Sequence, residues 1–158
     1  MLPNFLVVGA EKAATTWLYN RLNEHPDIFV PDTKEILFFN KYDSNFKETD
    51  KYKNLGIEWY KKFFKKYNKE TAIGEVSPMY LCDEYAPKRI KETLNDIKLI
   101  AILRNPIDRA YSHYWMAKNK NHTDLTFEQV VEKKEDRFIK RGLYYEQLIN
   151  YYQYFNCK

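Results

Sequence analysis

The sequence predicts an α/β fold with three layers, in which helices cover both faces of a mostly parallel central sheet. Short apolar runs alternate with helical patterns along its 158 residues, and this alternation is typical of parallel strands joined by right-handed helical crossovers. The length, the 44% share of hydrophobic residues and the absence of an internal repeat indicate a single domain, residues 1–158.

Two apolar runs predict buried parallel strands. Phe5 to Val8 ends at Gly9, as a strand does when it enters a tight turn, and Lys98 to Leu103 is the clearest second strand. Ile28 to Val30 and Ala72 to Gly74 predict shorter strands. The sheet is therefore expected to be built around residues 5–8 and 98–103.

Apolar residues at helical spacing predict the helices. The first helix begins at Thr15 and ends before Pro26, because proline disfavours helix at the preceding residue. Residues 57–67 alternate apolar and lysine positions, which predicts an amphipathic helix. The remaining helices are predicted over residues 85–95, 108–118, 127–135 and 143–155.

Composition limits the classes of partner. A net charge of +4 and an isoelectric point near 8.8 favour anionic ligands but fall short of a dedicated nucleic-acid binder. Cys82 and Cys157 form no disulfide framework or metal motif, so both are expected to be ordinary thiols. The apolar runs are much shorter than the roughly 20 residues of a membrane helix, and no targeting segment precedes the first strand. We therefore expect a cytoplasmic protein without a transmembrane segment.

The segment from Gly9 to Trp17 joins the first strand to the first helix and predicts an anion site. Backbone N–H groups at a helix N-terminus carry the positive end of the helix dipole, and Lys12 adds a donor. A Walker A loop needs a second glycine where Ala14 stands and a lysine where Thr15 stands. The second strand ends in Arg104 rather than in a metal-binding acid, so a magnesium-dependent triphosphatase is disfavoured.

The second junction runs from Arg104 into the helix that carries Ser112. The guanidinium is a planar, multidentate phosphate donor, and Ser112 lies where it can fold back towards it. Taken alone, Arg104 would equally pair with Asp108. Two anion-type junctions after two parallel strands, however, favour a ligand with two separate phosphate ends.

These segments resemble the sulfotransferases that use 3′-phosphoadenosine 5′-phosphosulfate (PAPS). Lys12 to Trp17 is similar to their K-x-G-T-T loop, with Ala14 in place of the glycine, and Arg104 to Ser112 resembles their 3′-phosphate site. Three further segments resemble the heparan-type and bacterial members: Pro31 to Phe39 (K-E-x-x-F-F), Gly74 to Tyr80 (G-E-x-S-P-x-Y) and Arg141 to Leu148 (R-G-x-Y-x-x-Q-L). The resemblance implies a P-loop-like fold that is incomplete at the C-terminal end, because family domains usually continue further.

The resemblance also implies roles. Lys12 would stabilise the leaving bisphosphate, and Glu35 would remove the acceptor proton. PAPS would be the co-substrate, 3′-phosphoadenosine 5′-phosphate (PAP) the product, and a glycan or other hydroxyl or amine compound the acceptor, with no metal and no nucleic-acid partner. The implied donor-binding residues are Ala10, Glu11, Lys12, Ala13, Ala14, Thr15, Thr16, Trp17, Arg104 and Ser112, and the implied acceptor-side residues are Glu75, Ser77 and Tyr80.

Two other classes of function stay open at this point. One is a kinase-like nucleotide enzyme that requires a triphosphate and Mg²⁺. The other is a non-catalytic anion-binding or nucleotide-binding module, in which the lysines between Lys61 and Lys69 contact an acidic glycan. The sulfotransferase resemblance implies that Trp17 contacts the adenine, and a tryptophan packed in the core is an equally good account of this residue. His25, His113 and His122 are expected to be surface or packing residues.

Overall fold

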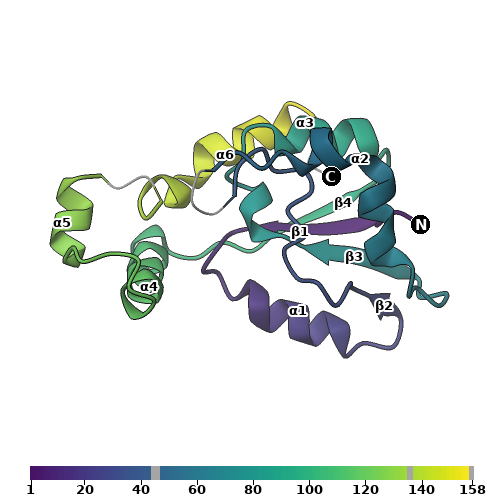
Figure 1. Ribbon diagram of the computed structural model, residues 1–158, viewed down its shortest axis with the longest axis horizontal. Coiled ribbons are helices and arrows are strands. Elements are labelled where there is room, and N and C mark those ends of the chain that lie inside the picture. Colours follow the sequence, from purple (N-terminus) through teal and green to yellow (C-terminus); the bar gives the residue numbers. More distant parts are fainter. Residues whose placement is uncertain (44–46, 135–136, 157–158) are drawn as a thin grey trace.

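Among the described residues of this computed structural model, the sheet has four strands, and the pairings between these strands are parallel. The structure describes residues 1–43, 47–134 and 137–156. The strand order β2-β3-β1-β4 places β1 between β3 and β4 at the centre of Figure 1. The bounds are Phe5–Gly9 for β1, Ile28–Phe29 for β2, Ala72–Val76 for β3 and Lys98–Ala101 for β4.

Alternating side chains of β1 enter the two hydrophobic layers of the core. Phe5 and Val7 pack on one face, and Leu6 and Val8 pack on the other, as the two-residue period of a strand requires. Phe5 lies opposite Gly74 of β3. A Cβ on Gly74 would fall 2.0 Å from the Phe5 ring, so glycine is what lets the two strands pair around that ring.

Helices cover both faces of the sheet, which confirms the three-layer α/β prediction. Figure 1 shows α1 (Thr15–Asn23) below the sheet, with α2 (Lys51–Lys61), α3 (Ala86–Thr93) and α6 (Tyr144–Tyr152) above it. The hydrophobic layer between α1 and the sheet is small. The layer on the opposite face of the sheet is rich in aromatic rings, including Phe38, Phe39 and Tyr60.

Two further helices lie at one end of the sheet in Figure 1. They are α4 (Pro106–Asn119) and α5 (Phe127–Glu132), and a separate hydrophobic cluster that includes Tyr114 and Val130 holds them together. A capping box at Thr126 starts α5. Three short 3₁₀ helices complete the described part: η1 (Lys62–Phe64), η2 (Pro78–Tyr80) and η3 (Lys140–Gly142).

The amphipathic helix predicted over residues 57–67 begins earlier and ends earlier. Asp50 caps α2 by accepting from the N–H of Lys53, and Gly56 interrupts the helix with a left-handed φ of 68°. The apolar period starts only at Ile57, so the first turns gave no signal. The helices predicted over residues 85–95 and 143–155 contain α3 and α6, and the predicted end at Glu135 lies outside the described residues.

The strand predicted over residues 98–103 is present as β4, but the prediction that it is buried was wrong. β4 ends at Ala101, and Lys98, Ile100 and Ala101 are exposed. Within the described ranges β4 pairs with β1 alone, so it is an edge strand. An apolar run has the same pattern in a central strand and in an edge strand, which is why periodicity misplaced it.

No helix of the described residues is both long and apolar enough to span a bilayer. Cys82 is a thiol without a disulfide partner, and burial raises its pKa to about 11. A thiol with so high a pKa is poorly nucleophilic at neutral pH. The expectation for Cys157 falls outside the described residues.

Candidate active site

The loop between β1 and α1 is fixed at its start by the neighbouring strand. The N–H of Ala10 donates to the oxygen of Ile102 at 2.7 Å, and the N–H of Ile102 donates to the oxygen of Gly9 at 2.8 Å. Lys12 and Ala14 then adopt left-handed φ values of 68° and 61°. Ala14 sits at the N-cap of α1, and its methyl side chain cannot accept from the first-turn N–H groups, so these groups and the positive end of the helix dipole can interact with an anion.

The junction between β4 and α4 lies beside this loop. Asn105 caps α4 by accepting from the N–H of Ile107 at 3.0 Å, and Pro106 occupies the first helical position. The Arg104 Nη1 donates to the backbone oxygen of Lys12 at 3.2 Å. The Lys12 Nζ in turn contacts the Met116 Sδ in α4 at 3.4 Å. The structure therefore brings the two predicted junctions together.

Both junctions open into one cavity of about 520 Å³. Its lining includes five cationic side chains and two carboxylates, so the cavity has a positive field that favours an anion. The cations are Lys12, Lys34, Arg104, Lys120 and Arg137, and the carboxylates are Glu11 and Glu35.

The electrostatic environment of Lys12 reflects this crowding. Burial lowers the pKa of Lys12, and the positive charges of Lys120, Arg104 and Lys34 lower that pKa further, while Glu11 opposes the shift. An anion that enters the cavity offsets the repulsion among these positive charges, so its binding lowers the electrostatic free energy of Lys12. Lys12 is thus placed to bind a phosphate or sulfate group.

Glu35 also lines this cavity and lies in the irregular segment between β2 and α2. Its N–H donates to the oxygen of Val76 at the end of β3, at 3.1 Å. Its Oε1 accepts from the Lys34 Nζ at 2.6 Å, and the same ammonium donates to the Thr16 Oγ1 at 3.0 Å. The predicted base and the predicted phosphate loop therefore face a common space.

A partly buried ion pair joins the loop to the chain around η3. The Glu11 Oε2 accepts from the Arg141 Nη1 at 2.7 Å and lies 3.7 Å from the His113 Nδ1. Burial lowers the pKa of His113 to about 4, so the ring is neutral at physiological pH. His113 is buried as the sequence predicted for a packing histidine, and it also lines the cavity.

The three residues predicted to contact the acceptor lie in the core instead. Glu75, Ser77 and Tyr80 are at most 1% exposed, and none of them lines the cavity. The Glu75 carboxylate accepts from Ser77, from the Tyr60 hydroxyl at 2.5 Å and from the Tyr80 hydroxyl at 2.8 Å. These polar groups satisfy one another, so they need no ligand; Pro78 is the residue of this motif that reaches the cavity.

This buried cluster supports the segment that carries Glu35. The N–H of Phe38 donates to the Tyr80 hydroxyl at 3.0 Å, and the N–H of Leu37 donates to the Ser77 Oγ at 3.4 Å. Burial raises the pKa of Glu75, while the three hydroxyl donors oppose the shift. The role of the motif is therefore to hold the neighbouring backbone in place.

The predicted donor-binding residues divide into two groups. Ala10 and Ala13 are buried, and Trp17 is 63% exposed, which excludes a core role for its ring. Sequence reasoning missed Lys120, which lies eight positions after Ser112 on one helical face with Met116 between them. The predicted residues that line the cavity are Glu11, Lys12, Ala14, Thr15, Thr16, Glu35, Arg104 and Ser112, and the missed ones include Lys34, Met116, Lys120, His122 and Arg137.

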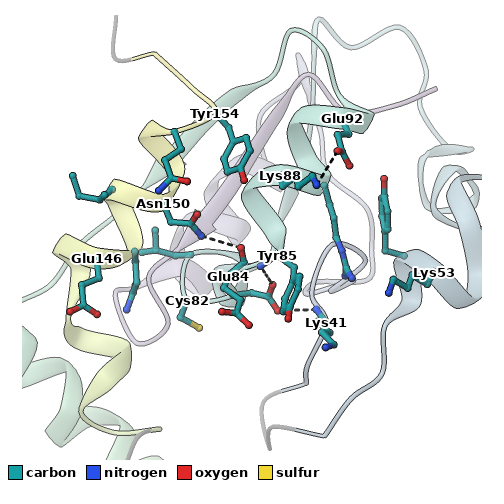
Figure 2. A pocket seen from close by; sticks show the side chains of 17 residues that line it. Lys41, Lys53, Cys82, Glu84, Tyr85, Lys88, Glu92, Glu146, Asn150 and Tyr154 are labelled. Atoms are coloured by element: carbon teal, nitrogen blue, oxygen red, sulfur yellow. Dashed lines mark hydrogen bonds and ion pairs between the residues drawn. The ribbon is translucent and has the colours of Figure 1, made fainter.

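A larger cavity of about 830 Å³ lies between α3, α6 and the segment around Lys41. Figure 2 shows Lys88 directed towards Glu92 and Asn150 directed towards Glu84. Its lining holds four cations and four carboxylates, and it shares no described lining residue with the smaller cavity. Because its charges are balanced, the larger cavity has no preference for an anion, and the smaller one is the candidate active site.

Comparison with known proteins identifies the family. The sulfotransferase domain family matches residues 2–158. The chain belongs to this family. The crystal structure of a sulfotransferase from Alicyclobacillus acidocaldarius superposes with a TM-score of 0.85 at 31% identity, over 98% of this chain and 70% of that chain. This likeness confirms the α/β fold of a sulfotransferase.

Curated sulfotransferases match the chain over part of their length. Membrane-associated sulfotransferase kil1 of Dictyostelium discoideum is 36% identical over 85% of this chain and 28% of its own length. Bifunctional heparan sulfate N-deacetylase/N-sulfotransferase 4 of Mus musculus is 39% identical over 78% of this chain and 14% of its own length. This chain therefore spans less than a third of the length of either relative.

Proposed function

We propose that this chain binds PAPS in the smaller cavity and transfers its sulfuryl group to a hydroxyl or an amine. The observation that carries the proposal is the contact between the two junctions, where Arg104 donates to the Lys12 backbone at 3.2 Å above a single cationic cavity. A donor with anionic groups at both ends of one adenosine matches two adjacent anion sites better than a triphosphate does.

The residues present fit such a donor. The first turn of α1, with Thr15 and Thr16, offers N–H and hydroxyl donors for the 5′-phosphosulfate. Arg104 and Ser112 line the part of the cavity next to α4 and would hold the 3′-phosphate. Among the described residues no cluster of metal-ligating side chains occurs, and the proposed chemistry uses none.

The proposed reaction is an in-line displacement at sulfur. The oxygen or nitrogen of the acceptor forms the new bond to sulfur, and Glu35 accepts the proton that this atom loses. Lys12 stabilises the electron pair left on the 5′-phosphate oxygen as the sulfur–oxygen bond to PAP breaks. The protein contributes positioning and charge stabilisation, and no covalent enzyme intermediate forms.

The acceptor class rests on the relatives. One of them is named for heparan sulfate, so a glycan is the first acceptor to test, with other hydroxyl compounds after it. The predicted cytoplasmic location is untested, and another relative is named as membrane-associated.

Replacement of Lys12 by alanine and of Glu35 by glutamine tests the assignment of roles. Each change should abolish sulfuryl transfer from labelled PAPS to a panel of glycan and phenol acceptors. Glu35→Gln should still bind PAP, because the glutamate lies on the acceptor side. Circular dichroism should show an unchanged fold for both variants.

Lys61→Ala is the control for loss of a surface lysine. Lys61 pairs with Glu58 on the solvent-facing side of α2, so its loss should leave the transfer rate unchanged. Full activity in Lys12→Ala or Glu35→Gln would contradict the assignment. Transfer that is lost only in Lys61→Ala would favour a role for the lysine-rich surface.

A further inference from the structure

The ammonium of Lys34 bridges the two sides of the candidate active site. It donates to the Glu35 Oε1 at 2.6 Å and to the Thr16 Oγ1 at 3.0 Å. Thr16 belongs to the first turn of α1, which the proposed function assigns to the phosphosulfate, and Glu35 is the residue that it assigns to the acceptor. An ammonium has three N–H donors, and these two contacts use two of them.

The backbone on both sides of Lys34 is held in place. The Tyr19 hydroxyl of α1 donates to the oxygen of Pro31 at 2.9 Å, and the N–H of Glu35 donates to the oxygen of Val76 at 3.1 Å. The Lys34 side chain is 22% exposed and forms part of the cavity wall. The fold therefore fixes the position of the Lys34 side chain, which is not a freely rotating side chain on the surface.

A second lysine–glutamate pair of this protein shows what an ordinary surface ion pair looks like. Lys61 and Glu58 on α2 also lie 2.6 Å apart, but the Glu58 side chain is 78% exposed and the pair faces solvent. Such surface ion pairs contribute little to the stability of a protein. Lys34 differs because it lines a cavity, has a second partner in α1, and is close enough to Lys12 to lower the pKa of that lysine.

We propose that Lys34 is a catalytic residue that contacts the sulfuryl group during transfer. This inference rests on the proposed function. In an in-line displacement the attacking acceptor atom, the sulfur and the leaving oxygen are nearly collinear, with the base beside the acceptor atom, and the other sulfuryl oxygens lie around the middle of that line. An ammonium that touches both ends of the site lies beside this middle, where it stabilises the charge on those oxygens. Lys34 gives up no proton, and the bonds that form and break are those already stated.

Titration of PAP and of PAPS into Lys34→Met tests this placement. The two ligands differ by the sulfuryl group alone, so a contact to that group affects only one of them. PAPS should bind about 10-fold to 100-fold more weakly than to the wild type, the range for one charged hydrogen bond, whereas PAP should lose less than about 3-fold. Lys34→Arg should restore most of the PAPS affinity, because it keeps the charge.

Lys61→Met is the matched control and should bind both ligands as the wild type does. Equal weakening of PAP and PAPS in Lys34→Met would overturn the inference, since it would assign Lys34 to the 5′-phosphate or to the fold. Unchanged binding of PAPS would also overturn it. If the wild type bound neither ligand, the proposed function itself would fail, which is a separate result.

Discussion

Tyr80→Phe should destabilise the protein by about 3 kcal/mol although it removes a single oxygen atom. In the wild type the Tyr80 hydroxyl donates to Glu75 at 2.8 Å and accepts from the N–H of Phe38 at 3.0 Å, and the side chain is fully buried. Loss of the bond to the carboxyl group costs roughly 0.5 to 3 kcal/mol, and an unsatisfied buried N–H costs roughly 1 to 3 kcal/mol.

Urea unfolding measures this effect. With a slope of about 2 kcal/mol per molar urea, the midpoint should fall by about 1.5 M while the slope stays unchanged. Tyr145→Phe is the matched control, because Tyr145 is 77% exposed and its change should stay within about 0.5 kcal/mol. Equal midpoints for the two variants would refute the view that the Glu75 cluster supports the segment carrying Glu35.

Two further changes probe the loop and its surroundings. Ala14→Gly should stabilise the protein by about 0.5 to 1 kcal/mol, because an alanine at a φ of 61° is strained; in thermal unfolding Ala13→Gly should instead destabilise, and a loss of stability in Ala14→Gly would contradict this. His113→Gln should change the pH dependence of stability. The pKa of His113 is lowered from 6.5 to about 4 on folding, so the wild type loses up to about 3 kcal/mol of stability as pH falls through this window. Denaturant unfolding at several pH values should show no such loss of stability in the variant. Parallel curves of stability against pH for the two proteins would refute the lowered pKa of His113.

Much of the fold could be predicted from local patterns. The run from Phe5 to Val8 and the helix from Thr15 gave the strand, loop and helix that form the first junction. The exposed edge position of β4 could not be predicted, because an apolar run carries no information about its neighbours on either side. The early start of α2 was missed because its first turns have no apolar period.

The candidate site was predicted best where a residue lies just past the end of a strand. Lys12 and Arg104 each lie three positions after one, and the structure places them in contact. Glu75 and Tyr80 lie in the core, because a polar motif at the end of a strand suits a buried hydrogen-bonded cluster as well as a binding site. Lys34 was overlooked because its sequence neighbour Glu35 explains it as an ion pair, and only the fold reveals its contact with Thr16.

The most direct test of the central claim is calorimetric titration with PAP, adenosine 5′-phosphate, adenosine 3′-phosphate and ATP with Mg²⁺. If the junctions at Lys12 and Arg104 hold opposite ends of one nucleotide, PAP should bind at least about 10-fold more tightly than either monophosphate, and Arg104→Ala should remove that advantage. ATP with Mg²⁺ should bind more weakly than PAP. Tighter binding of ATP with Mg²⁺, or a 3′-phosphate that adds no affinity, would contradict the claim.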